Sequence, residues 1–316
     1  MEENQYKSIK EKLNLSIERL YCQNKELLRA IEEALDNKGI DNPRVGYQGV
    51  LGSFSEEAAH NYFSQCEEMA RYDEFEEVFE AINKGEIDYG VLPIENSYTG
   101  EVLDVYDLVN KYNLYIIGEE IIKVRHNLVG VPGARLEDIK EVYSHPQAFG
   151  QSKMFLKKHK YMTAIPHANT AMASKFISEL TDKTKAAISS KRAASLYGLD
   201  ILEADINTND NNSTRFIVLA KNMKVSAECD KVSIVFTTQH TSGALYQVLS
   251  HFAYNGVNLL KIQSRPIKDK SWHYFFFVDL EGNLEDANML IALGKINAES
   301  KCFRILGNYR GYNIKP

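Results

Sequence analysis

Four short stretches of the sequence carry side chains that could bind a small anionic substrate and act on it. The most informative is residues 211–216 (NNSTRF), which lead directly into the apolar run 217–220. Asn, Ser and Thr favour loops because their side chains bond nearby backbone groups. The guanidinium of Arg215 offers a planar fork of N–H donors that matches a carboxylate. Taken alone, this stretch could equally be a capped strand start with a surface arginine. The choice between a binding role and a structural one therefore depends on the other three stretches.

The second stretch, residues 93–100 (PIENSYTG), follows the apolar run 89–92 and contains a carboxylate, an amide and hydroxyl groups. Turn formation accounts for its proline, asparagine and glycine. It does not account for a glutamate placed directly after a strand that we expect to be buried. We therefore expect Glu95, Asn96 and Ser97 to have a functional role.

The third stretch, residues 144–151 (SHPQAFGQ), is expected to begin a helix with Ser144 as the N-cap and Pro146 in the first turn. Gln147 and Gln151 are four residues apart and would lie on one face of that helix. His145 could act as an acid or a base, although a histidine beside a proline is more often structural.

The remaining stretch, residues 46–55 (GYQGVLGSFS), leads into a capping box formed by Ser53 and Glu56. A helix that begins here could receive an anion at its N-terminal N–H groups. The glycines are spaced G-x-x-G-x-x-G rather than G-x-G-x-x-G, so we do not expect a nicotinamide cofactor. A plain tight turn with a cap would explain the same residues.

From residue 44 to residue 222 short apolar runs alternate with helical periodicity, which is typical of an α/β domain with a mostly parallel sheet. Ligands in such domains bind at the carboxyl ends of strands, so chemistry is expected in the loops that follow strands. We expect strands at 44–47, 89–92, 115–122, 128–131, 142–143, 163–165, 186–188 and 216–220. We expect helices at 55–65, 75–84, 102–111, 147–158, 170–179 and 191–197.

The four stretches, together with AAISS at 186–190 and YGL at 197–199, resemble the motifs of the prephenate dehydratase family in order and spacing. The resemblance covers residues 44–222 and implies two lobes similar to a type II periplasmic-binding protein, with the active site in the cleft. One lobe would hold 44–122 with 206–222, and the other 123–205. The chain would then cross between the lobes twice.

Prephenate dehydratase is a carbon–oxygen lyase of phenylalanine biosynthesis that converts prephenate to phenylpyruvate, losing water and carbon dioxide. Formation of the aromatic ring drives the reaction, so neither a redox cofactor nor a metal is expected. The resemblance assigns Thr214 to the leaving hydroxyl and Arg215 to a substrate carboxylate, and makes Glu95 either a proton relay or an orienting group. Further cleft positions carried over from the family are Ser53, Phe54, Asn96, Ser97, Ser144, Gln151, Thr170, Asn212 and Phe216.

Two alternatives remain open from the sequence. Arogenate dehydratase acts on a substrate with an amino group where prephenate has a keto group, and the motifs do not separate the two enzymes. A non-catalytic amino-acid sensor could use the same two-lobed architecture. A sensor, however, has no use for the leaving-group contact that Thr214 would make.

Residues 230–312 have the predicted order strand–helix–strand–strand–helix–strand, which is ferredoxin-like. GALY at 243–246 and NLLKIQSRP at 258–266 resemble the ACT regulatory domain, which in this family binds L-phenylalanine at an interface between chains. The resemblance implies a homodimer or homotetramer and assigns the effector to Gly243, Ala244, Leu245, Asn258, Leu259, Gln263, Ser264 and Arg265. The family usually has threonine at Leu260 and glutamate at Gln263, so a pairing domain that has lost its effector is the alternative.

Residues 1–43 are expected to form an amphipathic helix that ends at 37–39 and packs on the main domain or on a second chain. It resembles at most one helix of the chorismate mutase domain often fused at this position, so mutase activity is not expected. A net charge of −6 gives no support for nucleic-acid binding, and no apolar run reaches the ~20 residues of a membrane span. Four scattered cysteines and a charged N-terminus without a signal-peptide core predict a cytoplasmic protein.

Overall fold

The structure is a computed structural model that describes residues 31–32, 34–35, 40–66, 68–267 and 272–312. The chain divides into two compact units. The first unit consists of residues 106–119 with the described residues before 42 and after 216, and the second of the described residues of 42–105 and 120–216. Three elements run from one unit into the other along the chain: α5 (Leu103–Tyr112), β5 (Tyr115–Lys123) and β11 (Ser213–Ala220).

One lobe of the second unit, here named the α3 lobe, has four strands of its own: β1 (Val45–Gln48), β2 (Met69–Tyr72), β3 (Tyr89–Asn96) and β4 (Gly100–Glu101). β1 pairs in parallel with β2 and β3, and β4 returns antiparallel to β3. The parallel crossovers are made by the helices α3 (Phe54–Tyr62) and α4 (Phe75–Lys84).

Helix α4 illustrates how the sequence sets these crossovers. It begins at a capping box between Glu74 and Glu77 and ends at Gly85, whose φ of 71° lies in the left-handed region. Its apolar face packs closely on β3, because a Cβ atom at Gly90 would lie 2.5 Å from Val78 Cγ1. A larger residue than glycine at position 90 would therefore push the helix away from the sheet.

The other lobe, the α8 lobe, has a five-stranded sheet of order β10-β6-β9-β7-β8. β7 pairs in parallel with β8 and β9, whereas β6 pairs antiparallel with β9 and β10, so this sheet is mixed rather than mostly parallel. The strands are β6 (Asn127–Gly130), β7 (Glu141–Ser144), β8 (Thr163–Pro166), β9 (Lys185–Ser189) and β10 (Asp200–Glu203).

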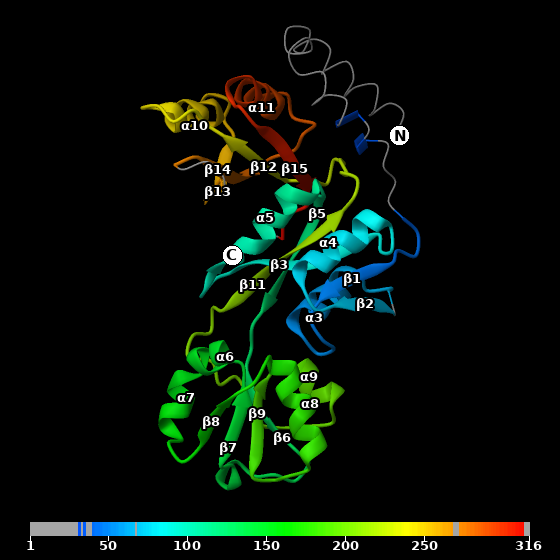
Figure 1. The fold of residues 1–316 in the computed structure, drawn as a ribbon, viewed down its shortest axis with the longest axis vertical. Helices are drawn as coiled ribbons and strands as arrows, with labels where there is room; N and C mark the ends of the chain where they lie inside the picture. Colours follow the sequence, from blue (N-terminus) through cyan, green and yellow to red (C-terminus); the bar gives the residue numbers. More distant parts are fainter. Residues whose placement is uncertain (1–30, 33, 36–39, 67, 268–271, 313–316) are drawn as a thin grey trace. The chain divides into compact units, whose positions relative to one another are not determined.

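Helices cover both faces of that sheet (Figure 1). α6 (Pro146–Gln151) and α7 (Lys153–Lys158) pack on one face, around Val142 and Ile188. α8 (Thr170–Leu180) and α9 (Lys191–Leu196) pack on the other, around Val129 and Ala187. The short 3₁₀ helix η1 (Leu136–Asp138) precedes β7. The two-lobed α/β fold expected from the sequence is confirmed.

The two chain segments that connect the lobes lie side by side. Asn207 Oδ1 accepts from His126 N at 2.6 Å, and Asn207 Nδ2 donates to Val124 O at 2.9 Å. Asp205 N donates to Asn127 Oδ1 at 3.1 Å. The connecting segments are therefore held to each other by side-chain amides as well as by backbone bonds.

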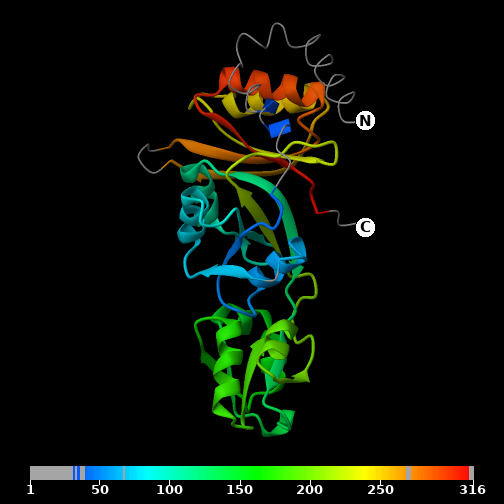
Figure 2. The same cartoon turned by 90° about the vertical axis from the view of Figure 1, so that its right-hand side faces the viewer.

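The first unit contains the order β12 (Lys231–Thr237), α10 (Ala244–Tyr254), β13 (Asn258–Pro266), β14 (Tyr274–Glu281), α11 (Ala287–Glu299) and β15 (Phe303–Tyr309). This is the ferredoxin-like βαββαβ order expected from the sequence. Its strands pair antiparallel in the order β13-β14-β12-β15. α10 and α11 lie next to each other over one face of the sheet (Figure 2), and the core between helices and sheet includes Ile234, Phe236, Phe252 and Leu293.

Only four residues of the expected N-terminal helix are described, and all four are helical: Ile31, Glu32, Ala34 and Leu35. Ile31 and Ala34 are buried in the core of the first unit, and Val225 N donates to Ala34 O at 3.3 Å. The rest of that expectation concerns residues outside the described ones. Among the residues that the structure describes, no helix combines the length and the apolar character that crossing a bilayer requires.

Candidate active site

Two of the four stretches are joined by hydrogen bonds: the turn after β3 and the start of β11. Ser97 N donates to Ser213 O at 2.9 Å, and Ser213 N donates to Ser97 Oγ at 2.9 Å. Ser97 Oγ in turn donates to Asn211 O at 2.9 Å. Residues 114 or more positions apart in the chain are thus fixed against each other.

Asn96 organises this junction with both ends of its amide. Its Oδ1 accepts from the backbone N–H groups of Tyr98 and Thr99, each at 3.0 Å. Its Nδ2 donates to Asn212 Oδ1 and to Thr214 Oγ1, each at 2.9 Å. Because Asn96 and Asn212 are 9% and 2% exposed, these bonds are shielded from water and fix the position of the Thr214 hydroxyl.

Arg215, the residue after Thr214 in β11, forms an ion pair with Glu95. Arg215 Nε donates to Glu95 Oε2 at 3.1 Å, Nη2 lies 3.0 Å from the same oxygen, and the two side chains are 12% and 33% exposed. Such a pair orients the guanidinium and keeps a negative charge next to it. The structure therefore pairs Arg215 with Glu95, two of the three residues expected to act in catalysis.

The N-terminus of α3 is held by a buried glutamate. Ser53 caps the helix, its Oγ accepting from Glu56 N at 3.3 Å. The expected capping box is only half formed, because the Glu56 carboxylate accepts from Gly52 N at 2.6 Å rather than from Ser53 N. Arg192 of the α8 lobe then holds Glu56 through two hydrogen bonds of 3.0 Å each.

The charge of Glu56 is kept by these donors. Burial alone would raise the pKa of its carboxyl group, but the hydrogen bonds from Arg192 and Gly52 outweigh burial and lower the pKa below its usual value of 4.5. Two further bonds connect the same loop with the AAISS and YGL motifs: Ser190 Oγ donates to Gly52 O and Tyr197 OH to Leu51 O. These motifs thus join the two lobes.

The start of α6 differs from the expectation. The N-cap is His145, whose Nδ1 accepts from Gln147 N at 3.2 Å, and not Ser144. Pro146 fills the first helical position, where an absent N–H group costs least, so the cap falls on the residue before it. Ser144 ends β7, is fully buried, and donates to Ile188 O at 2.7 Å. Its role as a substrate contact stays a prediction.

Gln151, at the end of α6, is held by a residue that the sequence interpretation missed. Its Oε1 lies 2.6 Å from Nε2 of His126, which is 2% exposed, and its backbone oxygen accepts from Thr208 N at 2.7 Å. Burial lowers the pKa of the His126 imidazole. The ring of Phe54 meets that of His126 edge to face, with centroids 6.2 Å apart. A lone histidine between Arg125 and Asn127 gave no sequence signal for this role.

Two other candidate residues lie at element ends or in the core. Thr170 is the first residue of α8, capped by Asn169, and its backbone oxygen accepts from Ser189 Oγ at 3.1 Å. Phe216 is 2% exposed within β11. No contact of either residue with the described part of the chain separates a substrate role from a packing role, so both assignments stay predictions.

The residues expected to bind the effector lie on α10 and β13 of the first unit. Gly243 precedes α10 with a φ of 80°, and Leu245 packs on the core. Arg265 is engaged elsewhere: its Nε and Nη2 donate to Asp107 of α5 at 3.1 Å and 2.7 Å. Tyr106 of the same helix meets Phe277 of β14 edge to face, so α5 packs on the sheet face opposite α10 and α11.

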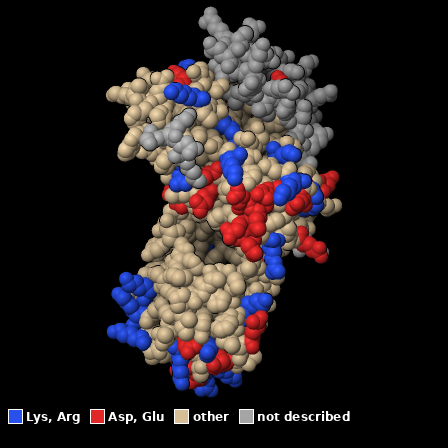
Figure 3. Space-filling model, in the orientation of Figure 1, with Lys and Arg blue, Asp and Glu red and all other residues tan. Residues whose placement is uncertain are grey.

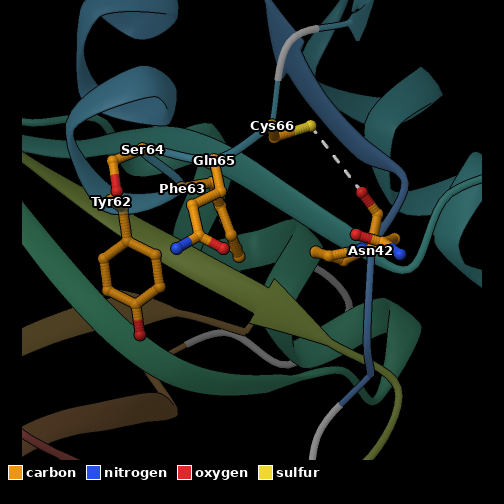
Figure 4. Close-up of a pocket in the computed structure, with 7 residues that line it drawn as sticks. Asn42, Tyr62, Phe63, Ser64, Gln65 and Cys66 are labelled. Atoms are coloured by element: carbon orange, nitrogen blue, oxygen red, sulfur yellow. Dashed lines mark hydrogen bonds between the residues drawn. The ribbon is translucent and has the colours of Figure 1, made fainter.

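Two surface features lie outside the four stretches. A cavity of about 520 Å³ beside the end of α3 is lined by Asn42, Pro43, Tyr62, Phe63, Ser64, Gln65 and Cys66 (Figure 4). Lysine side chains gather along α7, where Lys153, Lys157 and Lys158 are exposed (Figure 3). Neither feature includes a residue of the four stretches, so the candidate site remains the set of polar loops around Thr214.

Known proteins match this chain over most of its length. Residues 45–224 match the model of the family described as prephenate dehydratase. The chain is 37% identical over 277 residues to arogenate dehydratase/prephenate dehydratase 2 of Arabidopsis thaliana, which covers 84% of this chain and 72% of the relative. It is 35% identical over 308 residues to a bifunctional chorismate mutase/prephenate dehydratase of Buchnera aphidicola, covering 96% and 79%.

A solved structure gives the same result. The prephenate dehydratase of Arthrobacter aurescens in complex with L-phenylalanine has a TM-score of 0.75 and 30% sequence identity, over 84% of this chain and 89% of that one. The family model alone spans more than half of the chain, and the chain therefore belongs to the prephenate dehydratase family.

Proposed function

We propose that the chain converts prephenate to phenylpyruvate with loss of water and carbon dioxide. Besides the family membership, one observation carries this proposal: Asn96 Nδ2 donates to Thr214 Oγ1 at 2.9 Å. Since Thr214 accepts this bond, its own hydroxyl hydrogen can be donated to another oxygen, and the accepted bond strengthens that donation. The leaving hydroxyl of prephenate is the acceptor that the reaction requires.

The chemistry needs two bonds to break at the ring. The carbon–oxygen bond to the ring hydroxyl breaks, and the carbon–carbon bond to the ring carboxyl group breaks with its electron pair completing the aromatic ring. The carboxyl carbon leaves as carbon dioxide, and the oxygen takes up a proton and leaves as water. Thr214 stabilises the charge that develops on this oxygen, while its weak acidity means that the proton comes from another donor.

Arg215 is assigned to the carboxylate on the pyruvyl side chain of prephenate. A guanidinium matches a carboxylate in shape and charge, and Glu95 fixes its orientation through the contacts at 3.1 Å and 3.0 Å. A glutamate paired with arginine accepts hydrogen bonds better than it gives up a proton. We therefore favour the orienting role for Glu95 over the relay.

Prephenate and arogenate are distinguished by direct assay. The purified chain is incubated with each compound, and phenylpyruvate and phenylalanine are measured separately. The proposal expects phenylpyruvate from prephenate at a higher kcat/KM than phenylalanine from arogenate. A preference for arogenate would support the alternative that the name of the Arabidopsis relative suggests. Binding without turnover of either compound would support a sensor.

L-Phenylalanine is proposed as the effector of residues 230–312, taken as an ACT domain. The βαββαβ order and the complex of the Arthrobacter relative with L-phenylalanine support this assignment. Residues 44–222 are proposed as the catalytic domain, and the whole protein as a homodimer or homotetramer. Phenylalanine titrated into the activity assay should inhibit; no change up to millimolar concentration would favour a pairing domain without its effector.

A cytoplasmic location is also part of the proposal. The three described cysteines, Cys66, Cys229 and Cys302, are free thiols, as a reducing compartment would keep them. Localisation of a tagged chain in its own cells tests this, and a signal from an organelle, such as the chloroplast named for the Arabidopsis relative, would contradict it.

A further inference from the structure

His126 makes one side-chain hydrogen bond and leaves one ring nitrogen enclosed. Its Nε2 lies 2.6 Å from Gln151 Oε1, and its Nδ1 is buried without a hydrogen-bond partner among the described residues. The backbone on both sides of the ring is fixed, because His126 N donates to Asn207 Oδ1 and Ile206 N donates to His126 O. The ring therefore has little freedom to turn its Nδ1 atom toward a new partner.

The enclosed Nδ1 atom decides which nitrogen carries the proton. With the proton on Nδ1, a buried N–H donor would have no acceptor, and Gln151 would have to turn its amide nitrogen toward the ring. With the proton on Nε2, the ring donates to Gln151 Oε1 and only a lone pair is left enclosed. Unpaired buried N–H groups are rarer in proteins than unpaired acceptors, so the second arrangement is favoured.

We infer that His126, neutral and protonated on Nε2, is a positioning residue that fixes the Gln151 carboxamide with its NH₂ group directed toward the substrate. Gln151 is 8% exposed, and its Nε2 atom makes no hydrogen bond to any described residue. Two N–H donors suit a substrate with two carboxylates and a hydroxyl group, whereas the amide oxygen would repel the carboxylates. This inference rests on the proposed dehydratase function.

The surroundings of His126 favour the neutral ring. Phe54 meets the ring edge to face and Gln151 lies against its Nε2 atom, and neither side chain titrates. The charges nearest along the connecting segments, Arg125 and Asp205, pair with each other at 2.8 Å. Burial, opposed only in part by the Gln151 hydrogen bond, lowers the pKa of His126 below 6.5. Protonation would add a charge and an unpaired N–H group to the same enclosed site.

Two substitutions at position 126 distinguish the role of the ring Nε2 atom from that of Nδ1. Gln places an amide N–H near the position of Nε2, whereas Asn places its amide near Nδ1 and cannot reach Gln151. We expect His126→Asn to raise KM for prephenate by about tenfold with a smaller change in kcat. This effect corresponds to the loss of one charge-assisted hydrogen bond. His126→Gln should keep KM and kcat within about threefold of the wild-type values. For wild type we expect kcat/KM to fall on the acidic side of pH 6.5, where His126 takes up a proton. This fall should be absent in His126→Gln. Equal effects of the two substitutions would overturn the inference.

A measurement made without substrate tests the role of His126 independently of the proposed reaction. ¹⁵N NMR of labelled histidines, with the His126 signal identified by its absence in His126→Gln, should show a neutral ring with the proton on Nε2 at pH 7. Gln151→Glu should raise the pKa of His126 relative to that in wild type, because a carboxylate would replace the amide oxygen. A proton on Nδ1, or a pKa unchanged by Gln151→Glu, would overturn the inference even if prephenate is turned over. Failure of wild type to turn over prephenate would instead overturn the proposed function.

Discussion

Arg215 contacts a single oxygen of Glu95 twice, through a hydrogen bond from Nε at 3.1 Å and an ion-pair contact of Nη2 at 3.0 Å. Glu95 is the half-buried penultimate residue of β3, and Arg215 stands 120 residues later, near the start of β11. On the same two strands Asn96 Nδ2 donates to Thr214 Oγ1 at 2.9 Å. The fold thus holds a carboxylate-binding group and a hydrogen-bond donor on adjacent residues of one strand.

Replacing Arg215 by lysine tests its assignment to a substrate carboxylate. An ammonium group keeps the charge but cannot form two parallel hydrogen bonds. We expect Arg215→Lys to raise KM for prephenate by about tenfold, equivalent to ~1.4 kcal/mol of binding, with a smaller effect on kcat. Steady-state kinetics measure both constants. A KM equal to that of wild type would remove Arg215 from the substrate site.

The Glu56–Arg192 pair predicts a pH dependence of stability. Because the pKa of Glu56 is lowered from 4.5 in the folded chain, the pair contributes stability above pH 4.5 that is lost as the pH falls through the folded value. At pH 7 we expect Arg192→Met to lower the free energy of unfolding by about 2 kcal/mol, less than for a fully buried pair because Arg192 is 38% exposed.

Denaturant unfolding of wild type and Arg192→Met from pH 7 to pH 3 measures this effect. The difference between the two proteins should shrink below pH 4.5. Lys191→Met, at the exposed neighbouring position of α9, is the matched control and should change stability little. A difference that stays constant over the whole pH range would show that Glu56 is not what Arg192 stabilises.

We expect the Arg265–Asp107 pair to affect inhibition by phenylalanine but not the activity measured without phenylalanine. Arg265 lies in the segment assigned to the effector, while Asp107 is on α5, which follows the β3–β4 hairpin that carries Glu95 and Asn96. Asp107→Asn should weaken inhibition by phenylalanine, by about threefold or more, because Arg265 loses a charged partner. Activity without phenylalanine should change little.

Asp104→Asn is the control for that experiment, since Asp104 is an exposed aspartate one turn earlier on the same helix. It should leave both the inhibition constant and the activity unchanged. Inhibition curves for the two variants and wild type decide the matter. Identical inhibition of Asp107→Asn and wild type would rule out a role for the pair in regulation.

The sequence predicted the parts of the fold that depend on local patterns. The runs at 89–92 and 216–220 became β3 and β11, and residues 230–312 took the expected βαββαβ order. β2 (MARY) and β10 (DILE) were not predicted, because most of their residues are exposed or half-buried and they lack an apolar run.

The contacts that complete the site could not be predicted in the same way. Glu56 and Arg192 are 136 residues apart, and Asp107 and Arg265 are 158 apart, so neither pair leaves a local pattern. His126 lies in a connecting segment between Arg125 and Asn127, with no motif or ligand spacing around it that would indicate a functional role. Partners of this kind are set by the tertiary fold, whereas caps, turns and strands are set by neighbouring residues.

The hydroxyl of Thr214 is the centre of the account, and the comparison of Thr214→Ala with Thr214→Ser tests it most directly. We expect alanine to lower kcat for the conversion of prephenate to phenylpyruvate by about a hundredfold or more, while serine, which keeps the hydroxyl, retains most of the activity. Both variants should unfold at the same denaturant concentration as wild type. A kcat for a folded Thr214→Ala protein within a factor of about two of wild type would contradict the account.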